Sequence, residues 1–315
     1  MENNFEINHL KKIFYDEFIK NNVLLNEKFI IGVSGGPDSM WILNLMKDLD
    51  IVVAVVNYNK RKDSWKDQQI VEKFCLKNNI KCEVLILDKN QKYDGNFQKI
   101  ARDQRYQFYK KLYNKYDATK LILAHHKDDA LETYLFQKNS KRKPKLYGIN
   151  ILNNLLDMNI FRPMINLWFK DEILDMVNYF EIPYAIDYTN NLPVYTRNKI
   201  RLELKNISRD EKDKLFEELI NINSQLSLKN KEVEKEYLDF KNNNFSYKKL
   251  NLDHCYINEI LFEFIHKNIA DAKVCKNKLN SFKKFIQSEK NYKSFKINDK
   301  NFILKDHGTL KIDKK

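Results

Sequence analysis

The chain has 315 residues, of which 43% are hydrophobic and 31% are charged, and its formal net charge is +13. This balance excludes an intrinsically disordered chain, and the length suffices for one large core and a smaller second domain. No apolar run approaches the length of a membrane span, and the first residues lack the layout of a signal peptide. We therefore expect a cytoplasmic protein with no membrane partner.

Strands and helices alternate along the first part of the chain. Apolar periodicity indicates a helix within residues 1–28, and buried runs rich in β-branched residues indicate strands. The other expected elements are strands at 29–33, 51–56, 83–87 and 121–124, and helices at 67–79, 96–116 and 128–136. This order predicts an α/β fold with a doubly wound parallel sheet of the Rossmann-like type, which binds ligands beyond the carboxyl ends of its strands.

Two stretches near the end of this part, 161–164 and 182–198, hold three of the five prolines. We predict irregular loops there that close over a site. Beyond about residue 205 proline disappears and long charged helical patterns begin. We therefore expect a catalytic domain at 1–205 and a basic, mainly helical region at 206–315.

The C-terminal region is expected to end in short strands. Helices are predicted at 210–240, 256–268 and 274–287, and short strands between 294 and 312 with a turn at 306–308. Residues 272–315 contain 13 lysines and only four acidic residues. Such a segment is either a solvated lysine-rich surface or an RNA-binding one, and the sequence leaves both open.

The basic balance of the whole chain favours a polyanionic partner but does not choose between RNA, DNA and lipid. The four cysteines, at 75, 82, 255 and 275, form no C-x-x-C pair. The sequence therefore indicates neither a zinc site nor an iron–sulfur cluster.

The most informative stretch follows the first strand and reads Ser-Gly-Gly-Pro-Asp-Ser, beginning at Ser34. Gly35 and Gly36 permit positive backbone torsions and a close ligand, and Pro37 suits the first turn of a helix. Free amide donors and the positive end of a helix dipole then form a cradle for an anion. The loop lacks the lysine of the Walker pattern and the three-glycine dinucleotide fingerprint. An ordinary strand-turn-helix connection is the alternative.

Asp38 stands beside this cradle, and Ser39 ends it. A carboxylate repels a phosphate unless a cation lies between them, so Asp38 indicates Mg²⁺ that bridges to ATP oxygens. The alternative is that Asp38 only caps the helix.

A second group of polar residues follows the fourth strand: His125, His126, Asp128, Asp129 and Glu132. On a helix that starts near Asp128, Asp129 and Glu132 share one face. This acidic patch could hold Mg²⁺, bind an ammonium group or act as a general base. A metallohydrolase centre is an alternative, because His and Asp clusters bind zinc or manganese. A further alternative is that Asp128 caps the helix and His125 is buried.

Arginines form two more sets. Arg102 and Arg105 lie one helical turn apart beside Tyr106, which suits contacts to phosphate or carboxylate, although a solvated helix face is also possible. The other set suits recognition of a nucleotide or an RNA backbone, with an aromatic ring for stacking. It comprises Asp187, Asn190, Asn191, Tyr195, Arg197, Asn198 and Arg201.

These motifs, in this order, resemble those of the tRNA(Ile)-lysidine synthetases in the PP-loop ATP pyrophosphatase superfamily. The resemblance covers roughly residues 29–201 and rests on Ser34 to Ser39, Asn96 with Ala101 to Tyr106, His125 to Thr133, Arg162-Pro163, and the set that ends at Arg201. Two places depart from the family pattern. Asn57-Tyr58-Asn59 stands where many relatives have His and Gly, and Lys138-Asn139-Ser140 lacks a glycine.

The resemblance implies ATP-dependent joining of free L-lysine to C2 of the wobble cytidine in a tRNA(Ile) with a CAU anticodon. The C2 oxygen is first adenylated with release of pyrophosphate, and AMP then leaves as the amine attacks. In this scheme residues 34–39 bind the phosphates of ATP, Asp38 binds Mg²⁺, and Arg102 or Arg105 stabilises developing charge. Asp129 and Glu132 orient the lysine and help to deprotonate it.

His125 or His126 shares that work, and Arg197, Asn198 and Arg201 bind the tRNA or the lysine. No obligatory protein partner is expected. Two other functions stay open: a different PP-loop enzyme, such as a tRNA thiolase or an amidating ligase, and a non-catalytic RNA-binding protein.

Overall fold

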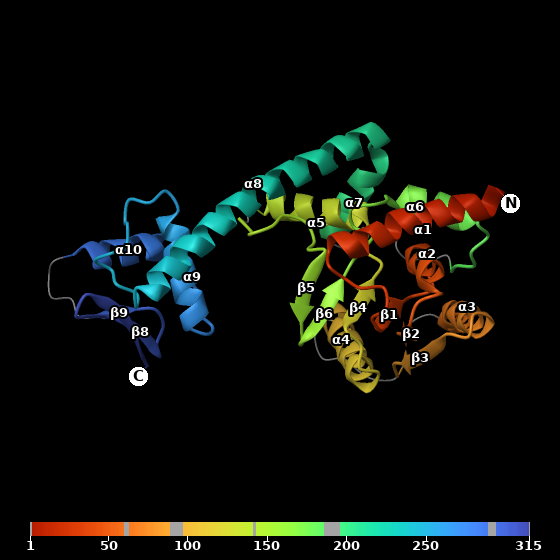
Figure 1. Cartoon of the computed structure of the whole chain (residues 1–315), viewed down its shortest axis with the longest axis horizontal. Helices are drawn as coiled ribbons and strands as arrows, with labels where there is room; N and C mark the ends of the chain where they lie inside the picture. The colour runs from red at the N-terminus through yellow and green to blue at the C-terminus, as the bar shows by residue number, and fades with distance from the viewer. Residues whose placement is uncertain are drawn as a thin grey trace. The chain divides into compact units, whose positions relative to one another are not determined.

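The computed structural model describes residues 2–59, 63–88, 97–140, 143–185, 196–288 and 294–314, with the backbone alone for 2–5, 97–98 and 196–198. The chain divides into two compact units, Met1–Ile220 and Asn221–Lys315 (Figure 1). The domain boundary expected near residue 205 falls in the last turn of α7 (Thr196–Asn206). The contacts within the chain divide it later, inside the long helix α8 (Arg209–Asn242).

The first unit is built on a six-stranded sheet with the order β3-β2-β1-β4-β6-β5. The neighbours from β3 to β6 run parallel, and β5 pairs antiparallel with β6 at one edge. The strands are β1 (Phe29–Val33), β2 (Ile51–Asn57), β3 (Lys81–Ile86), β4 (Lys120–Leu123), β5 (Leu152–Leu155) and β6 (Met158–Phe161). This topology confirms the predicted doubly wound α/β fold.

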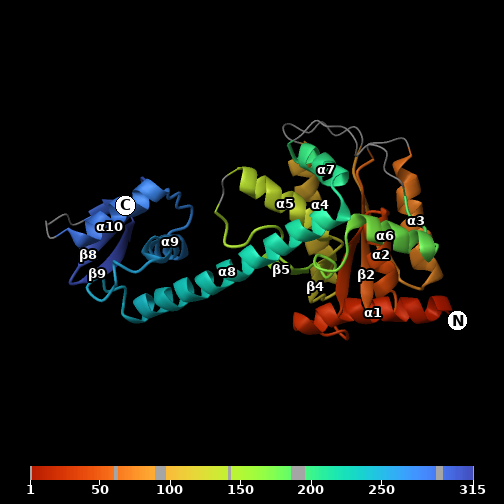
Figure 2. The same cartoon turned by 90° about the horizontal axis from the view of Figure 1, so that it is seen from above.

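Helices cover both faces of this sheet (Figures 1 and 2). They are α1 (Glu2–Lys20), α2 (Pro37–Met46), α3 (Ser64–Lys77), α4 (Phe97–Lys115), α5 (Lys127–Asn139), α6 (Lys170–Tyr179) and α7 (Thr196–Asn206). Alternate residues of β1 point to different cores. Ile31 packs with α1, α2, α3 and α6, whereas Ile30 packs with α4. Burial on both faces explains the continuous apolar runs that predicted these strands.

The sequence analysis did not predict four elements: β5, β6, α6 and α7. The hairpin of β5 and β6 turns through Leu156 and Asp157, which both have positive φ, without a glycine to mark the turn. Of the loop expected at 182–198, residues 186–195 lie outside the described part of the chain, and residues 196–198 belong to α7.

The second unit contains the end of α8, α9 (Ile257–Asn268), α10 (Lys276–Gln287) and a three-stranded antiparallel sheet. Its strands are β7 (Ser294–Lys296), β8 (Asn301–Asp306) and β9 (Thr309–Lys314). His307 and Gly308, with φ of 46° and 86°, form the predicted turn between β8 and β9. Positive φ at both positions fits the tight turn that matches strand twist. Phe264 and Phe282 are fully buried in the core of this unit.

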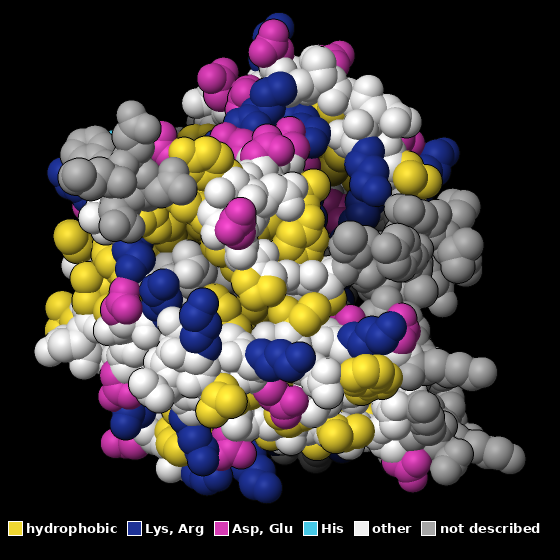
Figure 3. All heavy atoms as spheres, turned by 90° about the vertical axis from the view of Figure 1, so that its right-hand side faces the viewer, with side chains coloured by type: hydrophobic (Ala, Val, Ile, Leu, Met, Phe, Trp, Pro, Cys, Tyr) yellow, Lys and Arg dark blue, Asp and Glu magenta, His cyan; other side chains and the backbone are white. Residues whose placement is uncertain are grey.

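The basic side chains are not concentrated on every face of the protein. Figure 3 shows one face on which basic and acidic side chains are interspersed with hydrophobic patches. Such a mixed face gives no sign of a polyanion-binding surface. None of the helices in the described part of the chain is long and apolar enough to cross a bilayer.

The phosphate loop has the backbone that its sequence predicts. Gly35 has a φ of +88°, and Pro37 occupies the first turn of α2. The Ser39 hydroxyl accepts from the Ser34 N–H at 3.1 Å and donates to the Gly36 carbonyl at 2.9 Å. The Ala185 N–H donates to the Gly35 carbonyl at 2.8 Å. These bonds fix the loop without using the first N–H groups of α2, which have no partner within the helix and can face an anion.

The two glycines of the loop should respond differently to substitution. We expect Gly35→Ala to lower the free energy of unfolding by about 1–2 kcal/mol or more, because an L-residue is strained at this φ. Its Cβ would also lie 2.9 Å from the Asp67 carbonyl oxygen of α3. Gly36→Ala is the matched control, since Gly36 has a φ of −72° and its Cβ would meet only the Ser34 hydroxyl, at 3.6 Å. Urea unfolding measures both, and equal losses would contradict this account of the loop.

Candidate functional site

His126 lies at the centre of an acidic cluster formed by α2 and α5. It is buried, and its Nε2 atom is 3.8 Å from Asp38 Oδ1 and 3.4 Å from Asp129 Oδ2. Its Nδ1 atom is 3.5 Å from Asp128 Oδ2. Burial disfavours the imidazolium, but the three carboxylates outweigh burial and raise the pKa of His126. The cluster therefore holds a histidine that favours its charged form.

Asp129 and Asp128 each cap a helix. The sequence analysis gave helix capping by Asp128 as an alternative. Asp129 accepts the His126 N–H at 3.0 Å and so caps its own helix, α5. Asp128 accepts the Lys170 N–H at 2.7 Å and so caps α6 instead. Burial opposes their ionisation, yet the N–H groups and His126 hold the pKa of both carboxyls below the usual range. Both therefore stay ionised at neutral pH.

Two lysines that the sequence analysis missed balance this acidic cluster. The Lys170 ammonium forms a hydrogen-bonded ion pair with Asp38 Oδ2, and Lys212 Nζ of α8 lies 3.1 Å from Asp128 Oδ1. Lys170 is the first residue of α6, where a positive charge is unfavourable because it opposes the helix dipole. This unfavourable position is the only local sign in the sequence that Lys170 has a role besides forming the helix. Nothing near Lys212 in the sequence marks it, because its partner is far away along the chain.

Glu132 and Arg201 link α5 to α7. The Arg201 Nε and Nη2 atoms donate to Glu132 Oε2 at 3.1 and 2.9 Å, and Glu132 is buried. The charge of Arg201 also lowers the pKa of Asp129. Arg201, which was predicted from a separate motif, therefore shares one site with Asp129 and Glu132. Arg197 and Asn198 lie in α7 with Arg201, but their side chains are outside the described part of the chain. The other members of this set lie entirely outside it: Asp187, Asn190, Asn191 and Tyr195.

His125 faces a different, basic cluster. Burial, together with the charges of Arg162 and Arg105, lowers the pKa of His125 to about 4, although Asp129 opposes this shift. Arg102 lies near the same group, with its guanidinium carbon 4.8 Å from the centre of the Tyr106 ring. Among the described residues, no acidic side chain forms an ion pair with these three arginines. This half of the site is suited to an anion.

Arg162 enters the site from the end of β6. It is buried, and its Nη1 atom donates to the Asn150 carbonyl at 2.9 Å and to Asn153 Oδ1 at 2.5 Å. Burial lowers its pKa, and the neighbouring Arg102 adds to this effect. The β5–β6 hairpin, which the sequence analysis missed, therefore positions an arginine of the predicted Arg162-Pro163 motif.

Several buried polar atoms at this site have no hydrogen-bond partner: Asp38 Oδ1, His125 Nδ1 and Arg162 Nε. Buried polar atoms are paired in nearly all folded proteins, so their concentration in one place indicates a ligand that supplies the missing partners. An oxygen-binding cation fits Asp38, and a polar or anionic group fits the basic half.

The segment after β2 also faces this site, despite its departure from the family pattern. Asn59 has a φ of 51°, a conformation that asparagine tolerates better than most residues, and its N–H donates to Asn57 Oδ1 at 2.8 Å. This explains how the chain manages without a glycine here. The Tyr58 hydroxyl accepts a hydrogen bond from the Arg105 guanidinium, while burial raises the pKa of Tyr58. Tyr58 thus contacts one of the predicted catalytic arginines.

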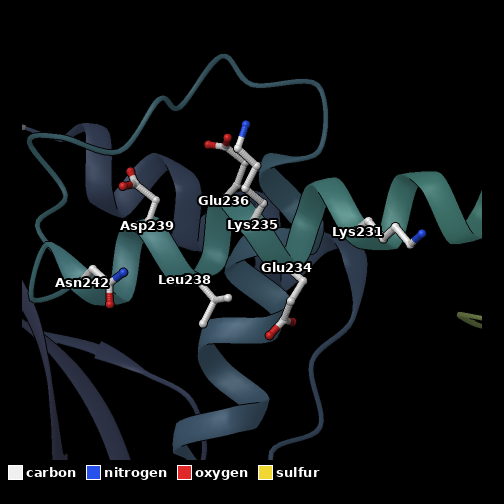
Figure 4. A pocket seen from close by; sticks show the side chains of 7 residues that line it. All are labelled: Lys231, Glu234, Lys235, Glu236, Leu238, Asp239 and Asn242. Atoms are coloured by element: carbon white, nitrogen blue, oxygen red, sulfur yellow. The ribbon is translucent and has the colours of Figure 1, made fainter.

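The second unit offers no comparable site among the residues that can be described. A hollow on α8 (Figure 4) is lined from this one helix only, so no second element encloses it. Glu232, Glu236 and His254 form a possible metal cluster nearby. However, His254 Nδ1 accepts the Tyr256 N–H at 3.1 Å, which leaves the proton on Nε2, facing Glu232 at 3.8 Å. This cluster is better explained by contacts within the chain than by a metal site.

Comparisons with known proteins agree with the geometry. The family model of the PP-loop domain matches residues 6–207. The tRNA(Ile)-lysidine synthase of Mycoplasmopsis pulmonis is 40% identical over 286 residues, which cover 91% of this chain and 99% of that protein. The tRNA(Ile)-lysidine synthase of Mesomycoplasma hyopneumoniae is 36% identical over 282 residues, which cover 89% and 93%.

A solved structure shares the fold alone. The U34-tRNA thiolase NcsA of Methanococcus maripaludis aligns with a TM-score of 0.55 and 16% identity, over 69% of this chain and 80% of that chain. The family match and the two relatives go further, because each covers most of the chain and the family match spans the residues that meet around His125 and His126. The chain therefore belongs to the PP-loop family and, within it, to the tRNA(Ile)-lysidine synthases.

Proposed function

We propose that this chain joins free L-lysine to C2 of the wobble cytidine of tRNA(Ile) with a CAU anticodon, through an adenylated cytidine, and forms lysidine, AMP and pyrophosphate. The observation that carries the proposal is the meeting of two oppositely charged half-sites beside one phosphate loop. The reaction combines a nucleophile that arrives as an ammonium with an anionic leaving group, and each half-site suits one of them.

The phosphate loop binds the polyphosphate of ATP through the backbone and hydroxyls of residues 34–39. Asp38 is the proposed ligand of Mg²⁺, which supplies charge neutralisation of the phosphates when it is bound. The fit rests on Asp38 Oδ1, which is buried and has no hydrogen-bond partner. The loop serine hydroxyls are already ordered by their bonds to one another and to Gly36. The cradle therefore needs little rearrangement to accept phosphate.

The basic half receives the cytosine oxygen and the phosphate that it attacks. Arg105 is the proposed catalytic arginine, held by Tyr58 and placed near His125, and Arg102 contacts the substrate. Fixed cations in a buried site stabilise the negative charge that develops during adenylation. His125 is uncharged at neutral pH, and its Nδ1 atom can receive a hydrogen bond from the substrate.

The acidic half binds the lysine. Its ammonium group, with an ordinary pKa of about 10.4, must lose a proton before it attacks. Asp129 has a lowered pKa, so it binds and orients an ammonium well but accepts a proton poorly. Glu132, held by Arg201, is the proposed partner that assists deprotonation.

The tRNA contacts we assign to Arg197, Asn198, Arg201 and the basic C-terminal region, 206–315. On α10 the side chains of Lys276 and Lys284 are exposed, and they can reach phosphate without disturbing the core. Lysine, tRNA and ATP with Mg²⁺ are then the complete set of reactants, in a cytoplasmic reaction without a protein partner.

Thiolation is a weaker proposal for this chain. Cys75 and Cys82 are neighbours, but both pack in the hydrophobic core of the first unit. Cys82 is the second residue of β3, near its amino end, whereas the phosphate loop follows the carboxyl end of β1. Sulfur chemistry at these cysteines would lie at the wrong edge of the sheet.

Pyrophosphate release tests the proposal. We expect release from ATP to require tRNA, and Asp38→Asn to lower its rate at least about 100-fold, because the charge proposed to hold Mg²⁺ at the reacting phosphates is lost. Asp48→Asn is the control, since Asp48 is also on the α2 side of the sheet but is exposed and pairs with Lys11. Near-normal release by the Asp38 variant, or release that ignores tRNA, would contradict the assignment. An RNA-binding protein without catalysis would release none.

The role of the basic tail needs substitutions, not a deletion. Removing residues 272–315 would take Leu279, Phe282 and Ile303 out of the core of the second unit. We instead expect Lys276→Glu with Lys284→Glu to weaken tRNA binding and to lower the slope of log affinity against log salt by about two, because roughly one counterion is released per phosphate contact.

The matched control for the tail is Lys73→Glu with Lys77→Glu, two exposed lysines on α3. Binding titrations over a range of salt concentrations compare the two pairs. Equal slopes for both pairs would mean that the lysines of α10 form only a solvated surface.

A further inference from the structure

Lys170 is the least expected residue of the site. Its backbone N–H is fixed by Asp128, while its ammonium reaches across to Asp38 on α2. A lysine at the first position of a helix opposes the helix dipole, so the position needs a compensating partner. Asp38 supplies it, although Asp38 is also the residue proposed to hold a cation for ATP.

The two oxygens of Asp38 have different surroundings. Oδ2 accepts from Lys170, whereas Oδ1 is buried without a hydrogen-bond partner and lies 3.8 Å from His126 Nε2. A divalent cation at Asp38 would therefore compete with the Lys170 ammonium for the charge of one carboxylate. Two cations so close to one carboxylate repel each other, so a divalent cation held by Asp38 would displace the ammonium.

Lys170 can move without disturbing the fold. Its side chain is 42% exposed, and the bond that anchors it to Asp128 uses the backbone only. The other two lysines of the site are held elsewhere. Lys212 is 11% exposed and pairs with Asp128, and Lys127 lies over the rings of Phe169 and Phe216, 4.8 and 5.2 Å from their centres. Of these three lysines, Lys170 is the one whose ammonium lies next to the phosphate loop and is free to change its position.

We propose that Lys170 is a polyphosphate-binding residue of the phosphate loop, which Asp38 holds in place until nucleotide and its cation arrive. In the free protein the ammonium neutralises Asp38. When the polyphosphate is bound, the ammonium leaves Asp38 and contacts phosphate oxygens, so that the charge of the site stays balanced throughout. This inference rests on the proposed ATP-dependent function and adds to it a residue that positions the pyrophosphate group.

Two binding measurements on the nucleotide-free, full-length protein test it. Electron paramagnetic resonance of free Mn²⁺ reports cation binding, and calorimetry with inorganic pyrophosphate and Mg²⁺ reports polyphosphate binding. Lys170→Met should bind Mn²⁺ about threefold more tightly or better, because a competing charge is gone, and pyrophosphate about tenfold more weakly, because a charged hydrogen bond is lost. Lys170→Arg should stay within about threefold of the unsubstituted protein for pyrophosphate.

Lys127→Met is the matched control, since Lys127 also starts a helix of this site but contacts aromatic rings and not Asp38. It should change neither affinity. Unchanged pyrophosphate binding in Lys170→Met, or unchanged Mn²⁺ binding, would overturn the proposal, and unchanged melting temperatures would exclude misfolding as the cause of a loss. If the unsubstituted protein binds pyrophosphate but transfers no lysine, the proposed function fails while the Lys170 result stands.

Discussion

The site depends on the mutual neutralisation of charges that would otherwise be too costly to bury. Asp38, Asp128, Asp129 and Glu132 all lie at or near one end of the sheet. Asp129 faces the neighbouring His126, and the other three each pair with a cation that is distant in sequence. Burying one partner without the other is strongly destabilising, so these pairs fix where the helices sit. Through them α2 and α5 are tied to α6, α7 and the start of α8. The fold of this region and its chemistry therefore rest on the same contacts.

The two adjacent histidines divide the site. His126 has a raised pKa among carboxylates, whereas burial and arginines lower the pKa of His125 to about 4. One peptide bond thus separates an acidic half-site from a basic one. For a reaction that brings an ammonium to an adenylated base, this separation lets the two substrates be bound by opposite charges at short range.

The sequence predicts well those features that depend on short stretches of neighbouring residues. The phosphate loop, its positive φ at Gly35 and the buried strands follow from short patterns, and the order of strands and helices gives the doubly wound fold. The β5–β6 hairpin was missed because its turn has no glycine, and Lys170 and Lys212 were missed because their partners are distant in sequence. Asn59 is the opposite case, because the sequence suggested a defect that the structure does not show. It stands where the family pattern has a glycine, yet it adopts the left-handed backbone conformation of the turn.

The most direct test of the account is to follow lysine itself. The full chain is incubated with ATP, Mg²⁺, isotopically labelled L-lysine and tRNA(Ile) with a CAU anticodon, and the nucleosides are then analysed by mass spectrometry. The account predicts that the label appears on a single cytidine, at the wobble position, with one AMP and one pyrophosphate for each lysine transferred. Pyrophosphate without labelled cytidine, or label on any other nucleoside, would contradict it.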